Sequence, residues 1–191
     1  GSLTNNQVVT KSVINDDLIR NTTYENVNGN YNVRGRFSYT KEIKLDTVHS
    51  IKYSVSMSSS VNKSVNFFND IKYNSLNTSL SPGLGFSYTW KDIFEIEPRY
   101  TISRTRTNFN IDQFTDQNFT RHSLRIRRRT FAPKKLEWRN DVLFQYNPNI
   151  ADGFQKSSWF WNSTVSYSLL KDKATLSLKA YDILNQNTNA R

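Results

Sequence analysis

The stretch LNTSLSPGLGFSYTWKDIFEIEPRY, residues 76–100, alternates apolar and polar side chains on both sides of a short polar turn at Lys91-Asp92. On both arms the apolar residues, such as Leu84 and Phe94, occupy even positions. Alternation with period two is typical of a β-hairpin that has one apolar and one polar face. Each arm is long enough to cross a membrane, which takes about 9–11 residues, whereas a globular strand has roughly 5–6. The stretch therefore predicts a hairpin of a membrane β-barrel, with its apolar face toward lipid and its polar face toward the lumen.

The composition of the 191-residue chain fits a membrane barrel better than a soluble β-sandwich. Hydrophobic residues make up only 36% of the chain and the mean hydropathy is -0.68, although aromatic residues reach 14%. A soluble sandwich needs more aliphatic residues to fill its core, whereas a barrel needs apolar side chains only on its lipid face. Disordered chains are also polar, but the regular alternation argues against disorder.

The net charge and the absent residue types narrow the possible functions. A net charge of +10 and a pI of about 9.8 suit anionic partners such as lipopolysaccharide phosphates, nucleic acid or acidic ligands. The chain has no cysteine, which excludes disulfides, thiol catalysis and cysteine-type zinc sites. No apolar run approaches the roughly 18–20 residues of a transmembrane helix, so helical spanning is excluded.

Similar alternation recurs along the chain and predicts about nine antiparallel, up-and-down strands in hairpin order. The predicted strands lie within residues 8–19, 31–40, 51–58, 76–90, 94–103, 120–127, 136–146, 159–169 and 174–180. Tight turns are expected near residues 45, 91, 134 and 172, and loops of roughly ten residues at 21–30, 59–70, 108–118 and 147–156. Outer-membrane barrels have short periplasmic turns and long extracellular loops, so the short turns are predicted to face the periplasm.

Aromatic residues gather at the predicted strand ends. Outer-membrane barrels place such rings in two girdles at the membrane interfaces. The alternative is that these residues form the core of a soluble sandwich, but a core does not need its aromatic residues at strand ends. The predicted girdle residues are Tyr31, Tyr146, Trp159 and Trp161 on the long-loop side, and Tyr39, Trp90, Phe94 and Trp138 on the short-turn side.

The stretch LSLKAYDILNQN, residues 176–187, resembles the penultimate strand of TonB-dependent receptor barrels, and more closely that of related outer-membrane barrel proteins of the Bacteroidota. The resemblance extends over residues 31–191, but its specific part is this final stretch. It implies a roughly 22-stranded barrel with an N-terminal plug, energised through TonB, that imports substrates across the outer membrane.

The sequence departs from that family in three respects. No plug and no TonB-contacting segment are visible, and the chain stops at Asn189-Ala190-Arg191 without the expected last strand and terminal aromatic residue. A count of about nine strands is odd, whereas bacterial barrels close with an even count. Residues 1–191 are therefore predicted to form a single segment, the C-terminal portion of a larger antiparallel transmembrane β-barrel.

A cluster of charges is predicted on the polar face of neighbouring strands. Three interpretations arise: an ion-pair ladder that lines the wall or holds a plug, a conduit or site for an anionic substrate, and a nucleic-acid site. Nucleic acid fits poorly because the other face of the same strand is apolar. The residues are Arg121, Arg125, Arg127 and Arg129, opposite Glu95, Glu97, Glu137 and Asp141.

Two further arginines, Arg104 and Arg106, lie in the outward register of their strand, beyond the apolar band. Because a guanidinium binds phosphate in a bidentate manner, they could contact lipopolysaccharide phosphates. The alternative is that they form a solvated strand end.

Nothing in the sequence predicts catalysis. The two histidines, His49 and His122, have no spacing typical of metal ligands, and isolated histidines are more often structural. No nucleophile elbow, P-loop or GxGxxG motif occurs. We therefore expect no enzymatic activity, no cofactor and no metal.

The predicted function is substrate uptake or binding by a TonB-dependent-type receptor of the bacterial outer membrane. The expected partners are outer-membrane lipid and lipopolysaccharide, the remainder of the barrel and its plug, TonB and a surface lipoprotein, but not nucleic acid. Two alternatives stay open. One is a structural or assembly barrel within a larger outer-membrane complex, and the other is a soluble, basic β-protein that binds polyanions.

Overall fold

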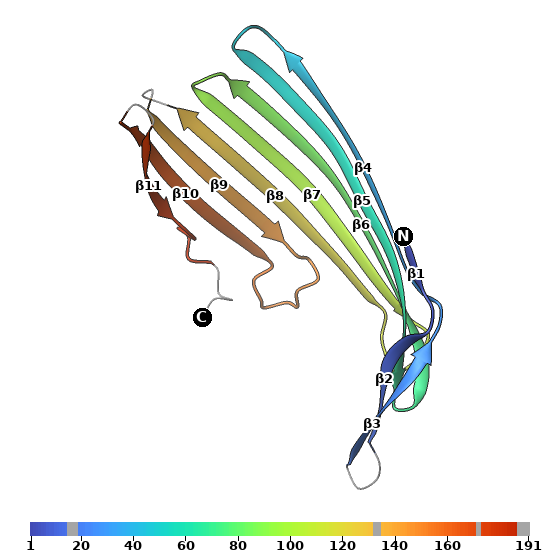
Figure 1. The fold of residues 1–191 in the computed structure, drawn as a ribbon. Helices are drawn as coiled ribbons and strands as arrows, with labels where there is room; N and C mark the ends of the chain where they lie inside the picture. The colour runs from blue at the N-terminus through green and yellow to red at the C-terminus, as the bar shows by residue number, and fades with distance from the viewer. Residues whose placement is uncertain (15–18, 132–134, 171–172, 187–191) are drawn as a thin grey trace. The chain divides into compact units, whose positions relative to one another are not determined.

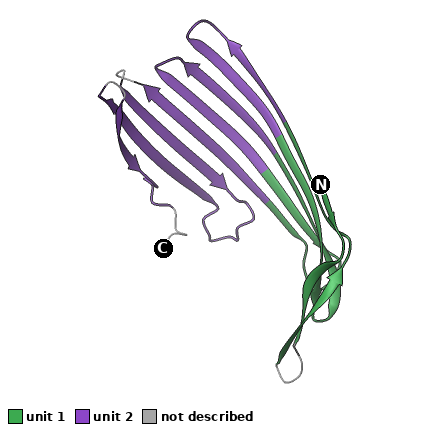
Figure 2. Ribbon diagram, viewed as in Figure 1, with its two compact units in different colours: residues 1–37, 57–81, 103–119 green, residues 38–56, 82–102, 120–191 purple. Residues whose placement is uncertain are grey.

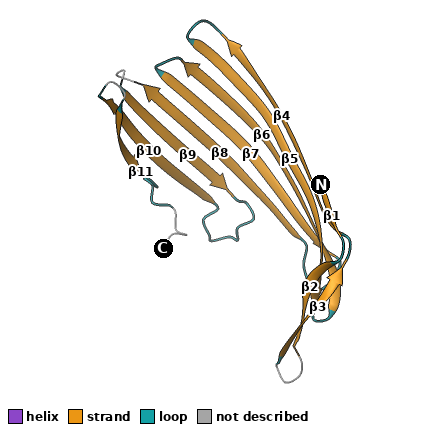
Figure 3. Cartoon of the chain, viewed as in Figure 1, coloured by secondary structure: helices purple, strands orange, loops and turns teal. Residues whose placement is uncertain are grey.

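Strands dominate the computed structural model, which describes residues 1–14, 19–131, 135–170 and 173–186 (Figures 1 and 3). The described residues form a nine-stranded antiparallel sheet in the order β1-β4-β5-β6-β7-β8-β9-β10-β11, and a separate two-stranded ribbon of β2 and β3. Among these residues no helix has the length and apolar character needed to cross a membrane. The strands are β1 (Ser2–Thr4), β2 (Gln7–Ile14), β3 (Arg20–Val27), β4 (Asn30–Lys44), β5 (His49–Phe68), β6 (Ile71–Trp90), β7 (Phe94–Phe109), β8 (Gln117–Phe131), β9 (Leu136–Tyr146), β10 (Ser157–Leu169) and β11 (Ala174–Ala180).

The prediction of an all-β chain with antiparallel, up-and-down strands is confirmed. Each of the eight strands β4–β11 contains one predicted alternating stretch. From β4 to β11 every strand is hydrogen-bonded to its neighbour in sequence, as hairpin order requires. The sheet is open in the described residues, because β1 and β11 are its two edges and do not pair with each other.

The predicted loop at residues 59–70 is wrong. Strand β5 continues to Phe68, and β6 begins at Ile71 after a two-residue turn at Asn69-Asp70. Both turn residues have positive φ, 44° and 69°, which is typical of a tight type I′ hairpin turn. The serine-rich composition concealed an alternation that Val61 and Val65 continue.

The predicted loop at residues 21–30 is also wrong. Strand β3 occupies most of it and pairs with β2 in a register that runs from Gln7–Val27 to Ile14–Arg20. Strand β2 confirms the strand expected within residues 8–19, although residues 15–18 lie outside the described part of the chain. The apolar alternation is weak here because polar residues occupy both faces of β3. Threonine and tyrosine nevertheless favour a strand.

The remaining connections are closer to expectation. The loop predicted at 147–156 is confirmed, since β9 ends at Tyr146 and β10 begins at Ser157. The loop predicted at 108–118 is shorter and covers residues 110–116. The tight turns near 45 and 91 are present, whereas residues 132–134 and 171–172 of the other two predicted turns lie outside the described residues. The predicted contrast of four short turns with four long loops is therefore wrong near residues 25 and 65.

The chain divides into two compact units, and strands β4–β8 contribute residues to both (Figure 2). Unit 1 comprises residues 1–37, 57–81 and 103–119, and unit 2 comprises residues 38–56, 82–102 and 120–191. The buried hydrophobic residues Val27, Val65 and Ile111 all belong to unit 1. Asn30 is the buried polar residue of this unit: its Oδ1 accepts a hydrogen bond from the Val65 N–H at 2.7 Å and its Nδ2 donates to Gln7 Oε1.

Unit 2 has no fully buried hydrophobic side chain among its described residues, and its strands are two-sided instead. Ile126 of β8 is paired with Val142 of β9, which is paired with Trp161 of β10. The next row toward the end of β8 is Arg127, Asp141 and Asn162. We call the side of the Ile126 row the apolar face and the side of the Arg127 row the polar face.

Candidate functional site

The polar face of unit 2 holds a network of ion pairs in two groups, each centred on one carboxylate of β9. The Arg129 guanidinium lies 3.1 Å from Glu95 Oε2 on β7 and 3.0 Å from Glu137 Oε1 on β9. Glu137 also accepts two hydrogen bonds from Arg139, at 2.6 and 2.8 Å. Because Glu137 joins two guanidinium groups and is only 21% exposed, it is the hub at this end of the network.

Asp141 is the second hub of the network. Its Oδ1 accepts a hydrogen bond from Arg125 Nε at 2.9 Å, and its Oδ2 lies 3.8 Å from Arg127 Nε. Arg127 also approaches Glu97 at 4.0 Å. The alternation in each strand places these groups on one face, and the β8–β9 register pairs Arg127 directly with Asp141.

Seven of the eight predicted wall residues therefore meet in this network. The exception is Arg121, which has no ion pair within the described part of the chain. Arg139 belongs to the network but was not among the predicted residues, although its odd-numbered position on β9 places it on the polar face.

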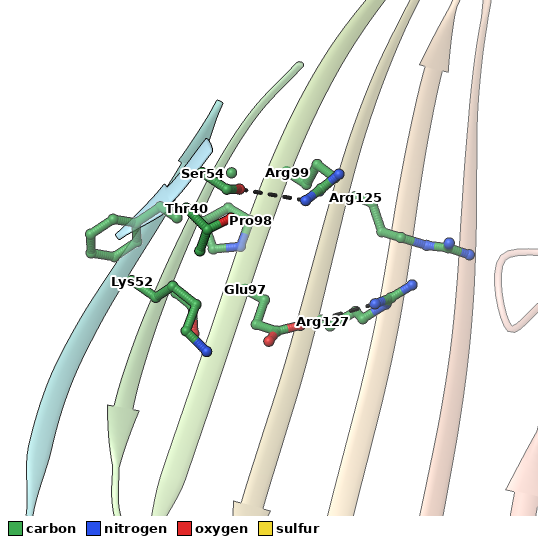
Figure 4. A pocket seen from close by; sticks show the side chains of 11 residues that line it. Thr40, Lys52, Ser54, Glu97, Pro98, Arg99, Arg125 and Arg127 are labelled. Atoms are coloured by element: carbon green, nitrogen blue, oxygen red, sulfur yellow. Dashed lines mark hydrogen bonds and ion pairs between the residues drawn. The ribbon is translucent and has the colours of Figure 1, made fainter. Parts of the chain in front are cut away.

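A pocket of about 460 Å³ opens on the polar face beside the network (Figure 4). Lys52, Arg99, Arg125 and Arg127 line it together with the single carboxylate of Glu97. The pocket is therefore rich in positive charge, and it could bind a carboxylate or phosphate group.

Arg99 differs from the other cations of the pocket. Its Nη2 donates a hydrogen bond to Ser54 Oγ at 3.4 Å, and no carboxylate of the described residues forms an ion pair with it (Figure 4). Space for this contact comes from Gly85, because a Cβ at that position would lie 2.5 Å from Ser54 Oγ and 3.5 Å from Arg99 Nε. Alternation along one strand does not reveal the pocket, which depends on the registers of β5, β6 and β7.

The two predicted lipopolysaccharide contacts, Arg104 and Arg106, lie in unit 1 and bind residues near the loop at 110–116. Arg104 Nε donates to Asn118 Oδ1 at 3.4 Å, and Arg106 lies 3.9 Å from Asp116 Oδ2. Asp116 in turn accepts a hydrogen bond from the Phe109 N–H at 3.0 Å. Both guanidinium groups thus have partners in the protein, and a lipopolysaccharide phosphate would have to compete with them.

The predicted girdle aromatics are all at least partly accessible. Several of them contact other aromatic rings. The ring centroids of Tyr39 and Tyr53 are 6.3 Å apart, and those of Trp159 and Phe144 are 4.6 Å apart. The residues Tyr39, Trp90, Trp138, Tyr146 and Trp159 are exposed, and Tyr31, Phe94 and Trp161 are half-buried.

Both histidines contact aromatic rings in unit 2. His49 lies 5.3 Å from the Trp90 ring, and its Nδ1 lies 2.7 Å from Asp46 Oδ2. His122 Nδ1 lies 2.6 Å from the Tyr100 hydroxyl. In the described residues no group of three or more histidine, cysteine, aspartate or glutamate side chains is arranged to hold a metal ion.

The stretch at residues 176–187, on which the predicted resemblance to receptor barrels depends, continues past the end of β11. Its last residue, Asn187, lies outside the described residues. The Ile183 N–H donates to the Trp161 carbonyl at 2.9 Å, and the Trp159 N–H donates to Gln186 Oε1 at 2.6 Å. Asp182 closes the segment, because its Oδ1 accepts a hydrogen bond from the Gln186 N–H at 3.0 Å. The described part of the stretch after Ala180 is therefore bound to β10.

Comparisons of the chain with protein-family models, with curated proteins and with solved structures found no match.

Proposed function

We propose that this chain is part of an outer-membrane β-barrel of the TonB-dependent receptor type, and that it forms a section of the wall around a substrate pathway. The observation that supports this most directly is the two-sided sheet of unit 2. One face is apolar and uncovered within the described chain, and the other holds the ion-pair network. A membrane barrel needs this division between lipid and lumen in every strand.

The uncovered apolar face argues against a soluble protein. Leu84 is 61% exposed and Leu178 is 76% exposed, and both lie in the apolar register of their strands. Burying such a side chain is worth roughly 1.5–3 kcal/mol, and monomeric soluble proteins rarely leave a contiguous apolar surface beyond a few hundred Å². Lipid would cover this face, whereas a soluble polyanion-binding protein would leave it in water.

The transport role rests on the resemblance of residues 176–187 to receptor barrels and on the pocket beside the network. A receptor of that type couples import to TonB through its plug, so transport is a property of the whole receptor. The part of the wall described here supplies cationic groups, chiefly Arg99, that could guide an anionic substrate.

The ion-pair network also favours a second function, that of a structural barrel within a larger outer-membrane complex. Glu137 and Asp141 compensate much of the positive charge on β8, and compensated charges suit a wall more than a binding surface. A stable partner that is extracted together with the native protein would favour this second function. Retention of an anionic substrate that is lost in Arg99→Met would favour transport.

The membrane orientation can be tested with spin labels because the chain contains no cysteine. Single cysteines introduced at residues 122–131 of β8, in the native protein that contains this chain, would be labelled with a nitroxide after reconstitution into bilayers. Even positions are expected to collide with lipid-soluble oxygen and odd positions with a water-soluble nickel complex. Equal collision with the nickel complex at both sets of positions would overturn the proposal.

A further inference from the structure

Arg128 lies on the apolar face, opposite its two neighbours in the ion-pair network. The register pairs it with Asn140 of β9, and Asn140 with Ser163 of β10. These three side chains form a polar row on the apolar face. The row before it along β8 is that of Ile126 and Val142.

The Arg128 guanidinium is held between two aromatic rings. It lies 5.2 Å from the centroid of Phe94 and 5.6 Å from that of Trp138. Phe94 is the first residue of β7, and Trp138 is near the start of β9, so both rings lie at the short-turn end of their strands. The side chain of Arg128 is thus directed along the apolar face toward the short turns.

Arg128 has no negative partner in the described part of the chain. Its Nε donates a hydrogen bond to Thr130 Oγ1 at 3.3 Å, and no described carboxylate forms an ion pair with it. By contrast, Arg127 and Arg129 on either side each lie within 4.0 Å of two carboxylates. Cation–π contacts offset only part of the cost of a charge on a lipid-facing surface.

Hydrogen bonds orient the side chains of Asn140 and Trp138 next to Arg128. Asn140 Oδ1 accepts a hydrogen bond from Trp161 Nε1 at 3.0 Å, which leaves the Asn140 NH₂ group directed away from that bond. Trp138 Nε1 donates to Ser163 Oγ at 2.9 Å, which fixes the ring beside Arg128. Arg128 Nη1 and Nη2 remain available for the bidentate contact that a guanidinium makes with phosphate.

We propose that Arg128, between Phe94 and Trp138, binds the phosphate of a phospholipid headgroup in the leaflet at the short-turn end. This inference rests on the proposed membrane orientation. A phospholipid is favoured over free phosphate because the apolar rows beside the site would contact its acyl chains. Trp138 and Phe94 are also among the aromatic residues predicted to lie at that interface.

The test uses the native protein in detergent, titrated with dioleoylphosphatidylglycerol and followed by native mass spectrometry. Arg128→Met should weaken binding of the tightest lipid about tenfold, the loss expected for one charge-assisted bidentate contact. Arg128→Lys and Phe94→Leu should weaken it less. Arg121→Met is the matched control, since it removes the same charge from the opposite face of the same strand and should leave lipid binding unchanged.

The inference is overturned if Arg128→Met binds the lipid as tightly as the wild type. It is also overturned if inorganic phosphate alone displaces the lipid at comparable concentrations, which would make the site one for free phosphate. Thermal unfolding, followed by tryptophan fluorescence, shows whether each variant is folded, and Phe94→Leu tests the site with the arginine still present. The spin-label pattern of β8 separates the two proposals. If the collision rates alternate along β8 and Arg128→Met still binds the lipid normally, only the lipid site is wrong. If the collision rates do not alternate, the proposed membrane orientation is wrong as well.

Discussion

Gly85 is the residue on which the geometry of the cationic pocket depends most. An alanine there would place its Cβ 2.5 Å from Ser54 Oγ and would crowd the Arg99 guanidinium. Alanine normally stabilises a strand relative to glycine, so a loss of stability would be a direct sign of this crowding.

We expect Gly85→Ala to lower the free energy of unfolding by about 1 kcal/mol, the low end of the cost of overpacking, because the serine side chain can rotate away. Ser54→Ala removes the crowded oxygen, so the double variant Gly85→Ala/Ser54→Ala should recover this loss. The measurement is a denaturant titration of the wild type, both single variants and the double variant. Additive losses would contradict the proposed contact.

Asp46 organises the turn between β4 and β5, outside the predicted membrane-spanning part. The hydrogen bond with the His49 side chain, followed by those from the Val48 and His49 N–H groups, lowers the pKa of the Asp46 carboxyl from its usual 3.8. A carboxyl whose pKa is lowered by folding stabilises the protein above its unfolded pKa, and this contribution is lost as the pH falls through the folded pKa.

Asp46→Ala should therefore unfold at a lower temperature than the wild type at pH 7, and the difference should shrink as the pH is lowered below about 3.8. Asp46→Asn keeps an oxygen that can accept the two backbone hydrogen bonds. Its melting temperature at pH 7 should therefore lie between those of Asp46→Ala and the wild type. Melting temperatures at several pH values provide the measurement. A difference that stays constant down to the lowest pH would show that the carboxylate charge has no part in stabilising the turn.

At the scale of elements, β9 is the centre of the ion-pair network because its carboxylates Glu137 and Asp141 each bind two arginines. Glu137 binds Arg129 and Arg139 at 3.0 Å or less, whereas Glu97 on β7 reaches only Arg127, at 4.0 Å. Isolated exposed ion pairs contribute little, but neutralising Glu137 would leave Arg139 without a carboxylate in the described residues and Arg129 with Glu95 alone.

Glu137→Gln should consequently lower the free energy of unfolding by about 1 kcal/mol, while Glu97→Gln should have an effect near zero. High salt screens such pairs, so the difference between the two variants should narrow at about 1 M salt. Unfolding titrations at low and high salt measure both effects. Equal losses for the two variants would mean that β9 is not the centre of the network.

Alternation within a single strand was sufficient to predict most strands and most residues of the ion-pair network, but not the pocket at Arg99. It placed Arg125, Arg127 and Arg129 on one face because parity alone assigns a face, and the same rule would have assigned Arg128 to the apolar face. It failed for β3 and for the second half of β5, where serine, threonine and asparagine occupy both faces. There the hydrogen bonds to a neighbouring strand stabilise the extended chain, and these partners are not visible in the strand's own sequence.

The pocket at Arg99 could not be predicted in this way. It depends on Ser54, Gly85 and Arg99 lying side by side on three strands, and this requires the registers of β5, β6 and β7. The sequence of β9 alone also does not show that Glu137 and Asp141 each bind two arginines. This depends on the pairing of β9 with β8, which sets Asp141 opposite Arg127.

At the scale of the whole molecule, the sheet has two open edges in the described residues, one at β4 and one at β11. Strand β1 pairs with β4 only over Asn30–Asn32, so residues 33–44 of β4 have an open edge in the described chain. The outer edge of β11 has no strand partner there either. Long open edges with exposed apolar residues are sites of pairing with further strands, and in a membrane their backbone groups cannot be satisfied by water.

These edges lead to a prediction about the native polypeptide that contains this sequence. If the strands that complete the sheet belong to the same chain, as in a plugged receptor, its intact mass after detergent extraction from membranes should be several times 22.3 kDa. A polypeptide near 22.3 kDa would contradict the receptor proposal, because β4 and β11 would then have to pair with another chain. In that case the assembly mass in mild detergent distinguishes the two alternatives, since a barrel built from several copies or partners would be larger than one chain. A protein that remains monomeric without detergent would instead have to cover its apolar face by itself, and this would favour the soluble polyanion-binding alternative.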